Sequence, residues 1–170
     1  PDPPATITNS FTNGAVSVTS GAGTSSSAAG GLVGANTGTI SDSVASGPVT
    51  GAGTQGQTVI LGGLVGMNGL TGGGTPTGLI TNSHATGSVT ATGDGQIGGL
   101  VGGNFATIQS SFAAGQVTTE RGTAGGFVGF NSIEGTINTS QATGSNPVTS
   151  GGQAGGFVGE HDRDTRAPIP

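Results

Sequence analysis

The sequence predicts an all-β fold, a parallel β-solenoid (β-helix) of about five coils, each a glycine-rich repeat of roughly 30 residues. Two observations suggest this fold: a five-residue glycine block recurs along the chain, and it alternates with a second block whose small side chains recur at every second position. A third is the scarcity of large side chains, since 38 of the 170 residues are Gly, six are Phe, and Trp and Tyr are absent. Such a composition cannot fill an ordinary globular core, and only its regular order argues against disorder.

The first repeated element is a glycine block of sequence Gly-Gly-(Leu/Phe)-Val-Gly. Its five copies start 27 to 36 residues apart and occupy residues 30–34, 62–66, 98–102, 125–129 and 155–159. Stacking these copies would place Leu on Leu and Val on Val, and would bury an apolar face that a single repeat cannot bury alone.

The second element starts with an Ile that is followed three residues later by a Ser. The pairs are Ile7 and Ser10, Ile40 and Ser43, Ile80 and Ser83, Ile108 and Ser111, and Ile137 and Ser140. Beyond the Ser, small residues and then Val recur at every second position, although the last copy reaches Val148 only after Asn146 and Pro147. This period of two predicts a strand with small side chains on its inner face, which suits a thin core.

Each copy therefore reads as strand, turn and strand. Coils about 4.8 Å apart would make a rod roughly 20–25 Å long, and crossovers between parallel strands favour a right-handed coil. We assign residues 1–159 to a single solenoid domain and residues 160–170 to a charged, Pro-containing tail.

An Asn lies two residues after the glycine block in four copies: Asn36, Asn68, Asn104 and Asn131. Stacked amides could form a hydrogen-bonded ladder from coil to coil. Alternatively, each Asn supplies a left-handed turn residue, and the sequence leaves both interpretations open. The fifth copy has His161 at this position, which suggests that the repeat pattern stops there.

The pattern Gly-Gly-Leu-Val-Gly-x-Asn, then Gly-Thr-Ile, then Ser-x-Ala-x-Gly-x-Val resembles the GLUG-type repeat of bacterial surface and secreted proteins, such as haemagglutinin-like adhesins and autotransporter passengers. The resemblance covers Thr6 to Gly159 and implies a secreted or cell-surface protein. The sequence departs from it at Leu79, where other copies have Thr before the Ile, and in the tail from Glu160.

Composition argues against several classes of function. The formal net charge is −5 and only three side chains are basic, so nucleic-acid binding is not expected. The absence of Cys removes disulfides and thiolate catalysis, and no stretch of about 18 apolar residues predicts a membrane span. Because the chain starts at Pro1, we expect a processed product or an excised fragment.

No catalytic, cofactor or metal site is predicted, and we do not expect an enzyme. The carboxylates between Thr6 and Gly159 fall in different repeats at different offsets: Asp42, Asp94, Glu120 and Glu134. They therefore form no repeated pair for acid–base chemistry. Ser83, His84 and Asp94 could be drawn as a triad, but Ser83 is the inward repeat Ser and His84 should face solvent. The acidic residues and His161 of the tail read as a solvated segment.

One outward position per coil, directly after the repeat Ser, holds Phe11, Val44, His84, Phe112 and Gln141. The first four are candidates for a ligand-contacting stripe, whereas scattered exposed apolar side chains are the ordinary alternative. Thr residues beside the repeat Ile, as at Thr6 and Thr39, hint at the hydroxyl arrays of ice-binding solenoids, although Leu79, Gln109 and Asn138 interrupt them.

Three functions follow from these features. The first is an extracellular structural or adhesive stalk or fibre. The second is a self-assembling filament, in which the glycine block Gly155, Gly156, Phe157, Val158 and Gly159 stacks on the first coil of another copy; the alternative is that the neighbours are repeats of a longer chain. The third is a module that binds ice or a glycan, and a host or surface glycan or protein would then be the partner.

Overall fold

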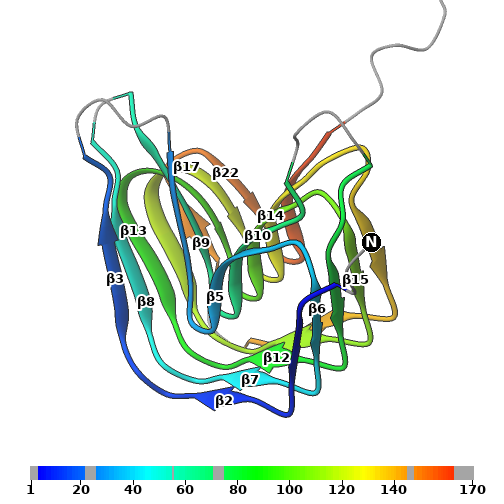
Figure 1. The fold of residues 1–170 in the computed structure, drawn as a ribbon. Coiled ribbons are helices and arrows are strands. Elements are labelled where there is room, and N and C mark those ends of the chain that lie inside the picture. Colours follow the sequence, from blue (N-terminus) through cyan, green and yellow to red (C-terminus); the bar gives the residue numbers. More distant parts are fainter. Residues whose placement is uncertain (1–3, 22–25, 55, 71–74, 145–147, 163–170) are drawn as a thin grey trace, which may run out of the picture.

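The computed structural model describes residues 4–21, 26–54, 56–70, 75–144 and 148–162. Their regular structure consists of strands without a helix, wound into a parallel β-solenoid of about four turns with a repeat of about 32 residues (Figure 1). Each of the four sheets contains one equivalent strand from each of five successive coils, and about four turns of the solenoid lead from the first of these strands to the fifth. The predicted fold class is confirmed, while Asn146, Pro147 and the tail beyond Asp162 lie outside the described residues. None of the described residues belongs to a helix long and apolar enough to cross a membrane.

Four parallel sheets run along the solenoid, and each collects one segment of the repeat. The Ile segments form β1 (Thr6–Thr8), β6 (Thr39–Ser41), β11 (Leu79–Thr81), β15 (Thr107–Gln109) and β19 (Thr136–Asn138). The segments after the repeat Ser form β2 (Phe11–Thr12), β7 (Val44–Ala45), β12 (His84–Ala85), β16 (Phe112–Ala113) and β20 (Gln141–Ala142).

The glycine blocks lead into β5 (Val33–Asn36), β10 (Val65–Asn68), β14 (Val101–Asn104), β18 (Val128–Asn131) and β23 (Val158–His161). The largest sheet contains β3 (Val16–Thr19), β8 (Val49–Ala52), β13 (Val89–Gly98), β17 (Val117–Gly125) and β21 (Thr149–Ser150). Its other half adds β4 (Ser26–Gly30), β9 (Thr58–Gly62) and β22 (Gln153–Gly155).

The register places equivalent residues of successive repeats side by side. Ile40 pairs with Ile7 on one side and with Ile80 on the other, and Val101 lies between Val65 and Val128. Like side chains therefore stack in columns, and the strands of each inner coil are hydrogen-bonded to the coils before and after them.

The coil has a two-lobed outline, because the chain folds back between β3 or β8 and β4 or β9 (Figure 1). The larger lobe is filled by Ile40, Ala45, Leu64, Val65, Ile80, Ala85, Leu100, Val101, Ile108, Ala113, Phe127 and Val128. The smaller lobe is filled by Ala29, Val49, Val59, Leu61, Val89, Ala91, Ile97, Val117 and Ala124. Each lobe is a stack of aliphatic columns, which explains how a glycine-rich chain buries a core.

The glycine block marks the corner between the two lobes. A Cβ added at Gly98 would overlap the carbonyl oxygen of Val101 and lie 2.6 Å from the amide nitrogen of Gly129 in the next coil. A Cβ at Gly99 would overlap the carbonyl oxygen of Gly126. The block therefore requires Gly because backbone meets backbone both within a coil and between coils.

Candidate functional site

The chain turns a sharp corner between the Ile segment and the short strand that follows. In all five coils the corner residue has a left-handed backbone, with φ of 47° to 51°, although none is Gly: Asn9, Asp42, Asn82, Ser110 and Thr139. Asn and Asp tolerate this conformation better than most other residues. Sequence reasoning missed this column; the signal was that three of its five members are Asn or Asp.

The repeat Ser directly after the corner holds the turn in place. Ser83 Oγ donates to the carbonyl of Thr81 at 2.8 Å and accepts from the amide of Ser43 at 3.1 Å. The Ser83 amide in turn donates to Ser111 Oγ at 3.2 Å, and the three Ser side chains are buried. The same bond from a Ser amide to the Ser Oγ of the next coil recurs along the stack, so the Ser column links the coils in addition to the sheets.

A ladder of Asn side chains runs inside the turn at the other end of the Ile segment, where the strand after the glycine block leads into it. Each amide nitrogen donates to Oδ1 of the Asn one coil further on, from Asn36 to Asn68 at 2.8 Å, then to Asn104 at 2.9 Å and to Asn131 at 2.8 Å. These Asn residues are buried and do not have a positive φ. Of the two interpretations of the sequence, the structure shows the ladder.

His161 takes the fifth place in this column. Its Nδ1 lies 3.1 Å from Nδ2 of Asn131, and the two residues are paired in the ladder between β18 and β23. His161 therefore continues the column, and the expectation that the repeat pattern stops there stays a prediction because the described residues end at Asp162.

The outward residues of the short strands also form a column. Register places Phe11 beside Val44, Val44 beside His84, His84 beside Phe112, and Phe112 beside Gln141. Phe11 is 66% exposed and Phe112 38% exposed. The rings of His84 and Phe112 are stacked, with centroids 4.4 Å apart and planes within 8°.

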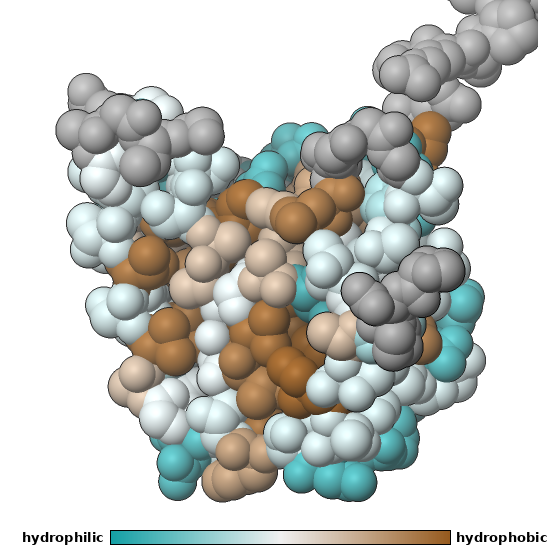
Figure 2. Space-filling model, in the orientation of Figure 1, coloured by the Kyte–Doolittle hydropathy of each residue, from teal (hydrophilic) through white to brown (hydrophobic). Residues whose placement is uncertain are grey.

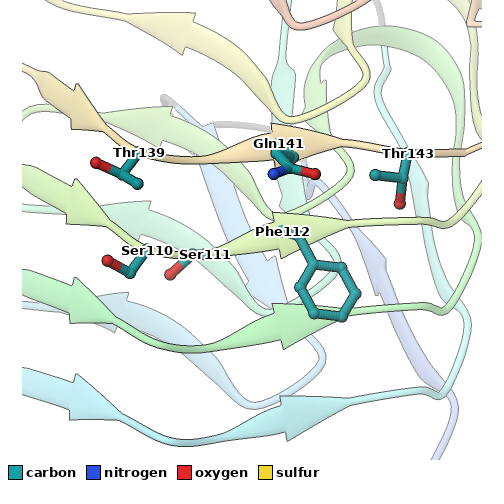
Figure 3. A pocket seen from close by; sticks show the side chains of 6 residues that line it. All are labelled: Ser110, Ser111, Phe112, Thr139, Gln141 and Thr143. Carbon is teal, nitrogen blue, oxygen red and sulfur yellow. The ribbon is translucent and has the colours of Figure 1, made fainter.

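Two shallow depressions flank this stacked pair. One is lined by Ser110, Ser111, Phe112, Thr139, Gln141 and Thr143 (Figure 3). The other is lined by Asp42, Asn82, His84, Ser110 and Phe112. Figure 3 shows the Phe112 ring leaning away from Gln141 and over the neighbouring strand, so the ring separates the two depressions.

Ser83, His84 and Asp94, which the sequence allowed as a triad, do not contact one another in the ways a triad requires, because each has other partners. Ser83 is buried in the Ser column, His84 is stacked on Phe112, and Asp94 forms an ion pair with Arg121 at 3.2 Å. Within the described ranges, no group of three or more His, Asp or Glu side chains is placed to share a metal ion.

The glycine block of residues 155–159, which the sequence suggested as a self-stacking end, lies in the last described coil. Phe157 stacks on Phe127 with ring centroids 4.8 Å apart, and Val158 pairs with Val128. Phe127 and Val128 are fully buried, whereas Phe157 and Val158 are half-buried because no described coil follows them.

Comparison with known families gives one match, the GLUG motif, over residues 25–50. This segment runs from β4 to the start of β8, so it spans nearly one turn that the other coils repeat in register. No curated protein and no solved structure gives a significant match to the chain.

Proposed function

Because this chain is a GLUG-motif β-solenoid domain, we propose that it is a rigid stalk or fibre segment of a bacterial surface or secreted protein, with a structural or adhesive role and no catalytic step. The observation that carries the proposal is the stacking of equivalent strands in all four sheets, together with the Ser and Asn columns. Bonds along the axis in every wall resist bending and local opening.

The shape of the surface supports this role. The described depressions on the short-strand face are shallow, and the described carboxylates do not converge. The partners that fit such a domain are neighbouring repeats of a longer chain, or a surface ligand. An extracellular location is part of the proposal and follows from the family resemblance.

Duplicating coils tests the spacer role. A copy of residues 39–135 inserted after residue 135 adds three coils in register, since residue 38 precedes Thr39 just as residue 135 precedes Thr136 in the stack. Small-angle scattering should show a particle about 14 Å longer with an unchanged cross-section. An unchanged length or a widened cross-section would contradict the proposal. Antibody labelling of intact source cells tests the location separately.

A second candidate, end-to-end assembly, is favoured by the apolar residues of the terminal coils. Ile7, Leu32 and Val33 are half-buried at the first coil, as are Phe157 and Val158 at the last. Figure 2, in which the view runs along the stack, shows apolar atoms gathered on the end that faces the viewer. In a head-to-tail contact, the last coil of one copy would cover the first coil of another.

Sedimentation over a range of concentrations tests the assembly. Self-association should raise the mass with concentration, and Phe157→Asp should abolish it because a carboxylate would be buried at the junction. Phe11→Asp is the control, since Phe11 lies on the lateral face. A monomer at all concentrations would exclude assembly and leave the stalk role untouched.

A further inference from the structure

The column of outward side chains contains one place where an aromatic ring offers a broad face to solvent. Phe112 rests on His84 with nearly parallel planes, so one face of its ring is covered. The residue is nevertheless 38% exposed, which leaves the other face and the edge open. Phe11 is more exposed, but it stacks on no other ring of the described residues and lines neither depression. The platform is therefore local to the third and fourth coils.

Polar groups without partners surround this platform. Within the described residues, the side chains of Ser110, Thr139 and Gln141 form no hydrogen bond, although all three line the depression in Figure 3. Ser111 differs, since its hydroxyl already donates to the carbonyl of Gln109 at 2.8 Å. The free hydroxyls and the amide can both donate and accept.

The left-handed corner fixes where two of these groups stand. Ser110 and Thr139 are corner residues of successive coils, held by φ values of 49° and 47°. The Ser residues that follow them bond to the backbone: the buried Ser111 donates to the carbonyl of Gln109, and the half-buried Ser140 donates to the carbonyl of Asn138. The polar rim is thus mounted on rigid backbone, which limits the entropy lost on binding.

From this arrangement we propose that Phe112 and its rim form a binding site for a neutral sugar ring. The apolar C–H face of a pyranose suits the negative face of an aromatic ring. Its hydroxyls would then meet Ser110, Thr139 and Gln141 at the rim. Asp42 is the one charged group lining either depression, and no Lys or Arg lines them, so anionic sugars are disfavoured.

This role is additional to that of a rigid spacer. A stalk with a sugar site on its flank would hold a glycan at a set distance along the axis. The sugar site needs no change of fold and does not use the apolar surfaces of the terminal coils. Its test is therefore independent of the test of end-to-end assembly.

The test begins with the full 170-residue chain on an array of neutral and acidic oligosaccharides, followed by titration calorimetry with the neutral saccharide that gives the strongest signal. Phe112→Ala should weaken binding about tenfold or more, because the stacking face is lost. Phe11→Ala is the matched control from the same column and should leave affinity unchanged. Both side chains are exposed, and thermal unfolding checks that both variants stay folded.

Phe112→Trp provides a second measurement. It keeps an aromatic platform and introduces the single Trp of the chain, so its fluorescence should change on titration with the same saccharide. The proposal is overturned if no neutral saccharide binds and lactose, maltose and cellobiose leave this fluorescence unchanged. Binding confined to acidic glycans, or equal losses in Phe112→Ala and Phe11→Ala, would overturn it as well.

Discussion

Asn68 donates its side-chain amide to Oδ1 of Asn104 at 2.9 Å, and both side chains are completely buried. Asn104 passes the pattern on by donating to Asn131 at 2.8 Å. Asn68 also reaches the carbonyl of Thr107 at 3.2 Å. A buried amide that donates and accepts along the axis links coils in a way that the sheets alone do not, because its bonds lie inside the core.

Asn104→Ala should therefore destabilise the fold. It removes the acceptor of Asn68 and the donor to Oδ1 of Asn131, and leaving buried polar atoms without partners costs about 2–3 kcal/mol. The bond from Asn68 to Thr107 keeps the loss from being larger. Urea unfolding followed by circular dichroism measures the difference. Asn138→Ala, at an exposed side chain, is the control, and equal midpoints for the two variants would refute the role of the ladder.

Thr139→Asn should stabilise the chain. Thr139 is β-branched and has a φ of 47°, a conformation that Asn adopts more readily, so we expect a gain of about 0.5–1 kcal/mol. The reverse change at the corner of the first coil, Asn9→Thr, should cost a similar amount, because Asn9 has a φ of 49°. Thermal unfolding checks both, and a loss of stability in Thr139→Asn would contradict the strain argument.

Gly126 and Gly156 hold the same position in successive coils and form a matched pair. A Cβ at Gly126 would overlap the carbonyl oxygen of Gly156, whereas a Cβ at Gly156 meets no atom within 4 Å. Gly126→Ala should then cost on the order of 3 kcal/mol or more, and Gly156→Ala should be nearly neutral. Chemical denaturation of both variants decides the matter, since similar losses would mean that coil-to-coil contact does not explain the need for Gly.

Several features of the fold could be read from the sequence because they repeat. The Ile at positions such as Ile40 and the alternation after Ser43 predicted stacked strands with small inward residues, and both residues are fully buried. The column from Phe11 to Gln141 followed from the same offsets. A residue at a given position of the repeat has the same role in every coil, so five copies of the pattern support each of these predictions.

Other features depend on packing that no single repeat reveals. The two-lobed outline arises where β8 leads into β9, between Ala52 and Thr58, in a stretch without a repeated pattern. The left-handed corner at Asn82 was hidden because Ser110 and Thr139 occupy the same position. The register places His84 beside Phe112, but their rings stack only because of the side-chain rotamers, which the sequence pattern does not predict.

One measurement tests the stacked-coil account most directly. Ser17, Thr50, Thr90, Thr118 and Thr149 are paired in that order across the largest sheet. The chain has no Cys, so Ser17→Cys with Thr149→Cys places two spin labels at defined sites. Four strand steps predict a narrow distance distribution centred near 19 Å between the two backbones, plus the reach of the labels. A broad distribution at longer distances would show that the coils are not stacked in register and would contradict the account.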